Sequence, residues 1–327
     1  MGILDMSVSI KDIAKATGYS PMTVSLSLNP RKSSVRVSKE TQAKIQAYAR
    51  KLGYKPDALA RSLKMGSSNV VGVMFCTSGD EFYWELQTCI DRELRAHGLL
   101  GFYTYWGTLE EFDASLEAMR QYRVCGILTG HDLPADYNRG VPALCYGTRN
   151  DFLESIYPDE FGLVECAVRH AVSRGYQRIG YLGYDYIERS RFFPEAVRAH
   201  GLEPACCHLG PAQSNLGALG AERLLNTPLP EVLICDRDHT AFQVMSELQS
   251  HGVAVPKDIA VIGINNTRFC EMTTPRLTTV DLRIPALASK LVNRLIYLCD
   301  HPGTPRQDEK FECAIIERDS CPAKEKT

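Results

Sequence analysis

The amino-acid sequence predicts a mixed α/β fold, with a short helical region followed by a larger body. Two observations carry this prediction. The first is a pair of short, capped helical segments near the start of the chain. The second is the alternation of apolar strand-like runs with amphipathic helical segments from Asn69 onward, which is typical of parallel sheets covered by helices on both faces. At 327 residues the chain is long enough for two or three domains.

The start of the chain predicts two short helices joined by a tight turn. Ser9 can cap the first helix, with Asp12 three residues later in the capping-box position. Gly18 tolerates the left-handed backbone with which helices commonly end. Ser20 can cap the second helix, and Pro21 suits its first position. The pattern is typical of a helix-turn-helix, whose second helix enters the DNA major groove, although another helical hairpin would share it.

A third amphipathic helix is predicted between Ser38, a good N-cap, and Gly53, a good C-terminal stop. The first two helices also supply a small apolar face. That face consists of Ile13, Ala14, Val24 and Leu28.

Charge is divided unevenly along the chain, although the net charge is only −2. Residues 1–64 hold 12 Lys and Arg against 4 Asp and Glu, whereas the remainder holds 25 against 35. A basic head on an acidic body suits a head that meets phosphate and a body that does not.

Residues 10–63 closely resemble the LacI-type family of transcription regulators, which includes the lac, gal and purine repressors. The residues that carry the resemblance are Ile10-Lys11-Asp12-Ile13-Ala14, Thr23-Val24-Ser25, Leu52-Gly53-Tyr54 and Ala58-Leu59-Ala60-Arg61-Ser62-Leu63. It continues weakly but in register through Pro275-Arg276-Leu277-Thr278-Thr279 and Glu317-Arg318-Asp319-Ser320. The resemblance implies a homodimeric DNA-binding regulator, usually a repressor, that binds a near-palindromic operator and responds to a small-molecule effector.

The resemblance also implies which residues contact DNA. The candidates are Ser20, Pro21, Met22, Thr23, Ser25, Leu26, Asn29, Arg36 and Leu63, with Ser27 and Arg31 as further polar candidates. Leu26 departs from the family, because many members carry a polar residue or arginine at this position. Leucine offers only apolar contact, for example with a thymine methyl group. Residues 56–64 match the family's hinge helix, and Leu63 matches the leucine that wedges into the minor groove.

The body alternates strands and helices after Asn69. Strands are predicted at Val70–Phe75, Gly101–Tyr105, Val124–Leu128, Ala143–Tyr146, Arg178–Leu182, Glu231–Cys235 and Ile259–Ile262, and helices at Trp84–His97 and Leu109–Tyr122. The family fold implies two doubly wound parallel-sheet subdomains in a bilobed, periplasmic-binding-protein-like body. Ligands of such sheets bind at the carboxyl ends of strands, here between the lobes.

The resemblance implies three segments with approximate boundaries. These are a DNA-binding domain at 1–55, a hinge helix and linker at 56–68, and an effector-binding and dimerisation body at 69–327. Lobe 1 would hold about 69–158 and 284–310, and lobe 2 about 159–283 and 311–327.

The resemblance assigns seven residues to the effector cleft, namely Asp80, Phe82, Tyr83, Asp159, Arg189, Asp238 and Asn265. Three positions depart from the family pattern, because Phe192 replaces a glycine, Arg237 an asparagine, and Asn265 an aspartate. An amide both donates and accepts, whereas a carboxylate only accepts, so Asn265 weakens the case for an ordinary neutral sugar. A cleft that is vestigial, or a regulator that responds to another protein, remains the alternative.

Other function classes find little support in the sequence. The 12 cysteines include no C-x-x-C pair, and Cys206-Cys207-His208 reads as a short strand with poor spacing for zinc, so no metal or cofactor is expected. No nucleophile elbow, P-loop or other catalytic motif is present, which argues against an enzyme. No signal peptide and no apolar run long enough for a membrane span are visible, so a cytoplasmic protein with reduced thiols is expected.

Overall fold

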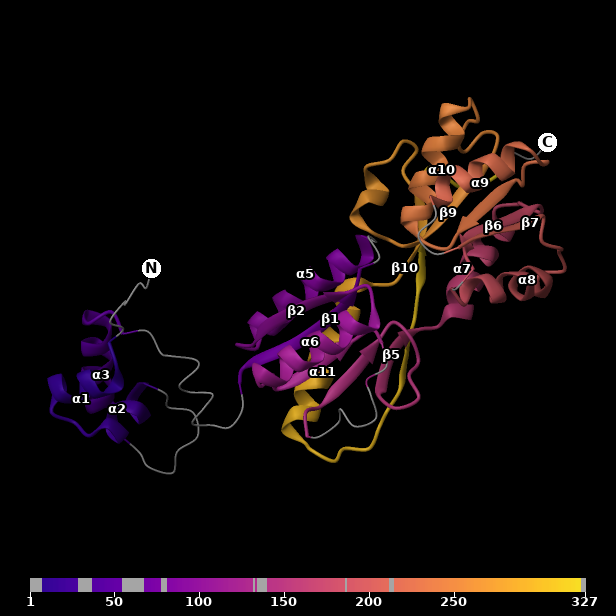
Figure 1. Cartoon of the computed structure of the whole chain (residues 1–327). Helices are drawn as coiled ribbons and strands as arrows, with labels where there is room; N and C mark the ends of the chain where they lie inside the picture. The colour runs from indigo at the N-terminus through magenta and orange to yellow at the C-terminus, as the bar shows by residue number, and fades with distance from the viewer. Residues whose placement is uncertain are drawn as a thin grey trace. The chain divides into compact units, whose positions relative to one another are not determined.

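The computed structural model describes residues 8–28, 37–54, 68–77, 81–131, 133, 140–185, 187–211 and 215–324. The chain divides into two compact units, residues 1–68 and residues 69–327 (Figure 1). The first unit is helical, and the second is an α/β body with two sheets.

The helical unit consists of α1 (Ile10–Thr17), α2 (Pro21–Leu28) and α3 (Lys39–Lys51). The predicted caps are confirmed for α1, where Ser9 and Asp12 form the capping box and Gly18 has a φ of 75°. Ser38 caps α3 by accepting a hydrogen bond from the backbone N–H of Thr41. The core of this unit contains Ile13, Ala14, Val24, Ile45 and Ala49, with Leu28 partly buried against it.

The first sheet of the body is parallel throughout and has the strand order β11-β5-β4-β3-β1-β2. Its strands are β1 (Val70–Cys76), β2 (Leu100–Trp106), β3 (Gly126–Thr129), β4 (Ala143–Tyr146), β5 (Glu154–Pro158) and β11 (Glu309–Phe311). The helices α5 (Glu81–Ala96) and α11 (Ile284–Asp300) pack together on one face, and α6 (Leu109–Gln121) covers the other. We call this part lobe 1.

The second sheet has the equivalent order, β12-β10-β9-β8-β6-β7, with only β12 antiparallel to its neighbour. Its strands are β6 (Ile179–Tyr184), β7 (Cys206–Gly210), β8 (Val232–Cys235), β9 (Ala260–Asn265), β10 (Thr278–Asp281) and β12 (Ala314–Ile316). The helices α7 (Glu160–Ser173) and α8 (Arg189–Ala199) cover one face, and α9 (Leu216–Leu225) and α10 (Asp238–Ser250) the other. A short 3₁₀ turn, η1 (Arg268–Glu271), follows β9. We call this part lobe 2.

The chain passes between the lobes three times. The crossovers lie between β5 and α7, between β10 and α11, and between β11 and β12. Neither lobe is therefore a continuous stretch of sequence, and residues 309–316 give an edge strand to each sheet.

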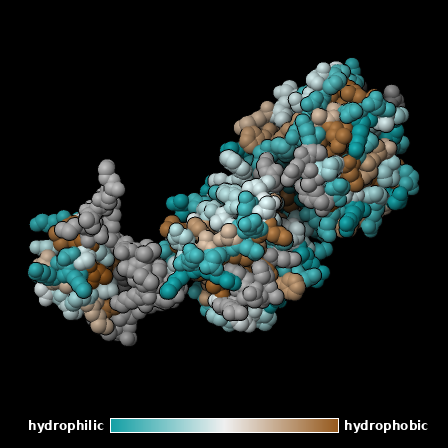
Figure 2. Space-filling view, in the orientation of Figure 1, coloured by the Kyte–Doolittle hydropathy of each residue, from teal (hydrophilic) through white to brown (hydrophobic). Residues whose placement is uncertain are grey.

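The structure confirms the predicted fold class, and most predicted strands agree with the observed ones to within two or three residues. No helix among the described residues is long and apolar enough to cross a membrane. On the face of the body drawn in Figure 2, hydrophobic residues form separate areas between hydrophilic ones.

Candidate nucleic-acid interface and effector cleft

The N-terminal turn of α2 presents its side chains to the surface. Ser20, Pro21 and Met22 are exposed, and Met22 is 66% accessible. The hydroxyl of Ser20 accepts a hydrogen bond from the backbone N–H of Thr23 at 3.1 Å and also bonds the Thr23 hydroxyl at 2.9 Å. Pro21 has no N–H, so the other backbone donors at this helix start are the N–H groups of Ser20 and Met22, and such donors at a helix start suit phosphate.

The opposite side of α2 is packed inward. Val24 is fully buried, and Ser25 and Leu26 are half-buried. The expectation that Ser27 could contact DNA was wrong, because Ser27 is fully buried and its hydroxyl donates to the carbonyl of Thr23 at 2.8 Å. A polar residue in the interior of a helix often bonds the preceding turn in this way.

Five of the residues predicted to act lie outside the described residues. These are Asn29, Arg31, Arg36 and Leu63 in the DNA-binding region, and Asp80 in the effector cleft. Their roles stay predictions from the sequence.

Arg189, one of the predicted cleft residues, forms a buried ion pair within lobe 2. Arg189, the first residue of α8, is buried, and its Nε lies 2.5 Å from Oε2 of Glu160 at the start of α7. Its guanidinium also donates to the backbone carbonyl of Asp236. Although burial disfavours its charge, the neighbouring Glu160 holds the pKa of Arg189 above its ordinary value. Arg189 therefore joins three segments that meet at the carboxyl ends of β6 and β8.

The carboxylate of Asp238, another predicted cleft residue, is also hydrogen-bonded within the protein. Asp238 is fully buried, and its carboxylate accepts hydrogen bonds from the Thr267 backbone N–H at 2.8 Å and from the Thr279 hydroxyl at 2.5 Å. Asn265 is buried at the end of β9 with a φ of 126°, a conformation that favours glycine. In this geometry Asp238 fixes the backbone after β9, and its predicted contact with an effector stays a prediction.

The remaining predicted cleft residues lie at the starts of two helices, α5 and α7. Phe82 and Tyr83 are half-buried at the start of α5, with their ring centroids 5.3 Å apart, and Tyr83 meets the Phe75 ring edge-on at 6.1 Å. Asp159 lies at the crossover before α7, partly exposed, 3.4 Å from the ammonium of Lys310. The ring contacts show that Phe82 and Tyr83 pack at the start of α5. Such packing is as compatible with a purely structural role as with ligand contact.

Residues that the sequence reasoning did not select lie between these positions. Arg237 stacks over the ring of Tyr184 at 5.1 Å, and its Nε lies 3.4 Å from the Asp236 carboxylate. The Tyr181 hydroxyl is buried and has no hydrogen-bond partner among the described residues, and burial raises its pKa well above the ordinary value. Asp236 and Arg237 directly follow the buried strand β8, and ligands of parallel sheets bind at the carboxyl ends of strands. This position in the sequence could have selected both residues.

Two polar contacts join α5 of lobe 1 to lobe 2. Nδ1 of His239 on α10 lies 3.0 Å from Oε1 of Glu81 on α5, and Glu85, one turn further along α5, accepts from the backbone N–H of Arg268 at 2.7 Å. A polar cavity of about 400 Å³ lies beside the second contact, at the crossover between β10 and α11. Its lining residues are Glu85, Asn266, Thr267, Arg268, Glu271, Asp281, Arg283, Ile284, Pro285 and Arg318.

Comparison with known proteins agrees with this architecture. Residues 9–57 match the family described as bacterial regulatory proteins, lacI family, and residues 168–321 match the periplasmic binding protein-like domain. The HTH-type transcriptional repressor PurR of Escherichia coli is 25% identical over 336 residues, covering 95% of this chain and 96% of the relative. A second PurR, from Shigella boydii, has the same identity and coverage.

Solved structures show the same fold. A lac repressor dimer bound to operator and the anti-inducer ONPF aligns with a TM-score of 0.84 and 21% identity, covering 97% of this chain and all of that one. A complex of the transcriptional regulator CelR with cellobiose aligns with a TM-score of 0.69 and 19% identity over 96% of this chain and 99% of its own. These two structures confirm the fold predicted from the sequence, and the family match over residues 9–57 agrees with the resemblance.

Proposed function

Since the chain carries a LacI-family helix-turn-helix domain followed by a periplasmic-binding-protein-like domain, we propose that it is a transcriptional repressor that binds operator DNA as a homodimer. A small molecule held between its lobes sets its affinity for the operator. The observation that carries the proposal is the family match over residues 9–57 together with the exposed first turn of α2. Its role is regulatory rather than enzymatic, and it acts in the cytoplasm, associated with the nucleoid when bound to DNA.

The first turn of α2 reads the major groove. Met22 and Pro21 supply apolar contacts to base edges, and Ser20 and Thr23 supply hydroxyls near phosphates. Leu26, half-buried one turn later, favours a thymine methyl group over a guanine edge. The DNA-binding domain spans residues 1–55, and Asn29 and Arg36 approach the backbone.

The hinge at residues 56–68 joins this domain to the body at 69–327. A helix of this length is marginal in water alone, so pairing of two copies over the operator centre would stabilise it. Leu63 then enters the minor groove and opens a base step. The two-fold symmetry of the dimer demands a near-palindromic operator.

The effector binds between the lobes and shifts the balance between two arrangements of them. The Glu81–His239 and Glu85–Arg268 contacts join α5 of lobe 1 to lobe 2, so a ligand between the lobes competes with or reinforces them. Asp80, Phe82, Tyr83, Asp159 and Asn265 are candidate ligand contacts, together with Arg237. Such a shift is a coupling free energy between two sites.

The alternative is a regulator whose cleft is vestigial or which responds to another protein. A specific observation favours it: Arg189 and Asp238, the family's ligand positions, already have internal partners. Thermal-shift screening with sugars, sugar acids and nucleobases separates the two. A ligand that raises the melting temperature supports the effector, and a flat screen across these classes favours the alternative.

Selection of bound duplexes from a random DNA pool tests the DNA-binding proposal directly. We expect a palindromic motif with a fixed central step. Affinity for it should fall steeply with salt, because each phosphate contact releases counterions and contributes about 0.9 to the slope of log affinity against log salt. Failure to enrich any motif, with and without candidate effectors, would contradict the proposal, as would an affinity that does not depend on salt.

A further inference from the structure

The polar cavity at the crossover between β10 and α11 is lined by none of the residues proposed above to hold the effector. Its walls come from Glu85 on α5 of lobe 1, from the segment after β9 that contains Asn266 and Arg268, from the crossover at Asp281–Pro285, and from Arg318 after β12. At about 400 Å³ it has the size of a small-molecule site. A ligand in this cavity would therefore touch both lobes and the crossover between them.

Arg318 places a buried positive charge on the wall of this cavity. Its side chain is only 10% exposed, and its guanidinium donates to the carbonyl of Leu277 at 2.9 Å and to Oδ1 of Asn266 at 2.8 Å. Both of these acceptors are neutral. The carboxylate of Glu271 lies 3.6 Å away, beyond hydrogen-bond distance, on a side chain that is 73% exposed. Since buried charges are normally paired and hydrogen-bonded, Arg318 is incompletely compensated within the protein.

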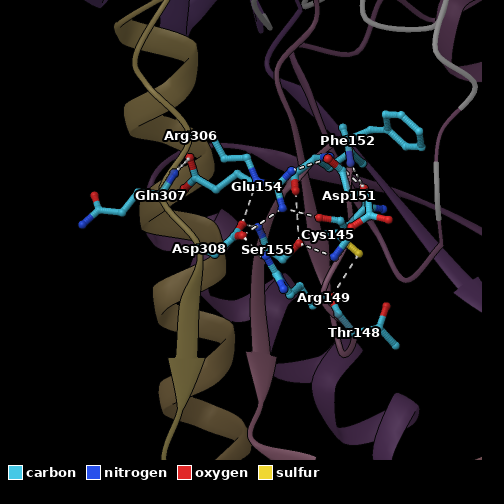
Figure 3. Close-up of polar contacts among 12 residues, drawn as sticks. Cys145, Thr148, Arg149, Asp151, Phe152, Glu154, Ser155, Arg306, Gln307 and Asp308 are labelled. Carbon is cyan, nitrogen blue, oxygen red and sulfur yellow. Dashed lines mark hydrogen bonds and ion pairs between the residues drawn. The ribbon is translucent and has the colours of Figure 1, made fainter. Parts of the chain in front are cut away.

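Two arginines of lobe 1 show what fuller compensation looks like. Arg294 on α11, whose side chain is 21% exposed, donates to the buried carboxylate of Glu154 at 2.9 Å. Arg306, which is 34% exposed, pairs with Asp308 at 2.8 Å (Figure 3). Arg318 is more buried than either of them, and yet it has no carboxylate within hydrogen-bond distance in the part of the chain that the structure describes. This contrast indicates that the wall at Arg318 suits an anion.

Two further arginines and the start of a helix line the same cavity. Arg268 and Arg283 are exposed, and Arg268 lies over the ring of Phe269 at 5.0 Å. Neither guanidinium has an ion pair with a carboxylate among the described residues. α11 begins at Ile284 on the cavity wall, and the amino end of a helix of 17 residues favours negative charge. Positive charge thus reaches the cavity from three separate segments of the chain.

The lining also contains three carboxylates, of which only one competes for Arg318. Glu85 accepts from the backbone N–H of Arg268 at 2.7 Å, and Asp281 accepts from that of Arg283 at 2.8 Å. Glu271 is the carboxylate beside Arg318, and its exposure allows it to turn away. An anion that enters the cavity therefore has to displace only Glu271.

The backbone on two sides of the cavity is strained. Asn266 has a φ of 55° and Arg283 a φ of 47°, values that residues other than glycine rarely adopt. Arg318 holds the first turn through the Asn266 side chain, and Asp281 holds the second through the Arg283 backbone N–H. Strain of this kind is often kept at functional sites. A ligand on Arg318 and Arg283 would act on both turns, one in lobe 2 and one at the crossover.

We propose that this cavity binds a small organic anion that carries a carboxylate or a phosphate group. Arg318 is its principal partner, Arg268 and Arg283 close on it from the rim, and the Glu271 side chain moves out. Because both lobes supply the walls, the bound anion stabilises the arrangement in which α5 contacts the segment after β9. Binding of the anion does not depend on the proposed function, whereas its effect on operator affinity rests on it.

The first test is isothermal titration calorimetry of the full-length protein with citrate and, separately, with inorganic phosphate. Sodium chloride keeps the ionic strength constant, so that general screening by salt produces no binding curve. Saturable binding of citrate supports a carboxylate ligand, and saturable binding of phosphate supports a phosphate ester. A protein that binds neither anion overturns the proposal.

Variants of the lining then locate the bound anion. Glu271→Gln removes the competing carboxylate and should strengthen binding about fivefold, whereas Arg283→Gln should weaken it by about the same factor, the size expected of an exposed ion pair. Arg318→Met should abolish binding. Arg191→Gln, an exposed position on α8 outside the cavity, is the matched control and should bind as the wild type does. If Glu271→Gln and Arg283→Gln both bind with wild-type affinity, the anion lies elsewhere and the proposal fails, even where Arg318→Met does not fold.

The last test measures binding to the selected operator with and without the anion that binds, at constant ionic strength. We expect the dissociation constant to change about fivefold or more at saturation, within the usual range of coupling between sites. Glu271→Gln should respond at a lower concentration of the anion than the wild type. An unchanged constant in protein that holds the anion overturns the coupling, and operator binding without any anion tests the proposed function separately.

Discussion

The candidate DNA-binding turn and the candidate effector cleft differ in how exposed the residues are that the family resemblance selects. Ser20, Pro21 and Met22 in the first turn of α2 are exposed and ready for a partner. Arg189 and Asp238, which were predicted for the cleft, are buried and already paired within the protein. The same kind of inference thus selects surface residues in one unit and internal ones in the other.

The difference teaches that a matched position can be retained for folding as well as for binding. A charged side chain that is buried and removed from its partner leaves an uncompensated charge, so such positions are costly to change whether or not a ligand uses them. An exposed residue on a short helix carries no such cost. The predictions below separate the two roles.

The largest expected effect is on folding, from Arg189→Met. Breaking the buried pair with Glu160 should lower the free energy of unfolding by about 3–5 kcal/mol, measured by urea denaturation. Arg191→Met, an exposed position on the same helix, is the matched control and should change it by less than about 0.5 kcal/mol. Equal stability of both variants, with effector response lost only in Arg189→Met, would instead assign Arg189 to ligand binding.

The next effect is on DNA, from Leu63→Ala in the proposed hinge. Loss of the minor-groove wedge should weaken specific operator binding about tenfold or more, or about 1.4 kcal/mol, while the dimer remains intact. Fluorescence anisotropy with the selected operator measures the affinity, and analytical ultracentrifugation checks the dimer. Leu63→Met, which keeps an apolar wedge, serves as the control. An alanine variant with wild-type affinity would refute the hinge assignment.

A smaller effect is expected from Ser20→Ala, which removes the hydroxyl that accepts from the Thr23 backbone N–H. Loss of such a cap costs about 1 kcal/mol of stability, and the substitution also removes a candidate phosphate contact. Ser20→Asp restores the cap but places a negative charge near phosphate. If Ser20→Asp recovers the wild-type stability but not the operator affinity, Ser20 contacts DNA. If Ser20→Asp recovers both the stability and the affinity, Ser20 acts only as a helix cap. Urea denaturation measures the stability, and fluorescence anisotropy measures the affinity.

The smallest effect concerns pH and the Glu81–His239 contact between the lobes. Burial raises the pKa of Glu81, but the hydrogen bond and charge of His239 and the charge of Arg237 outweigh it, so its pKa lies below the ordinary 4.5. Its contribution to stability is therefore present above pH 4.5 and is lost as the pH falls through the lowered value. Urea denaturation should show wild type more stable than Glu81→Gln at pH 7, with the gap shrinking below pH 4.5. A gap independent of pH would contradict this.

The sequence predicted the helical unit well because its signals are local. The capping box at Ser9, the glycine at 18 and the serine at 38 act on their own helices and need no tertiary contact to be read. Ser27 was misjudged because its hydroxyl bonds its own helix and its burial depends on α3, whose Gln46 reaches the Ser27 carbonyl.

The cleft was harder to predict because its chemistry arises between distant segments. The pairing of Arg189 with Glu160, and of Asp238 with Thr279, depends on how strands are ordered in the sheet. Arg237 drew notice only as a departure from the family pattern. Its stacking on Tyr184 could not be read from the sequence, because the two lie on neighbouring strand ends that are far apart in the chain.

The shared position of β11 and β12 has a consequence for synthesis of the protein. Because residues 309–316 supply an edge strand to both sheets, a ribosome must translate as far as Phe311 before lobe 1 is complete and as far as Ile316 before lobe 2 is complete. Until then β5 and β10 expose unpaired backbone edges, the surfaces on which nascent chains associate wrongly. A nonsense mutation between Asp300, where α11 ends, and Glu309 would leave both sheets without an edge strand, so quality control in the cell would meet a product with two incomplete lobes instead of a protein with one sound half.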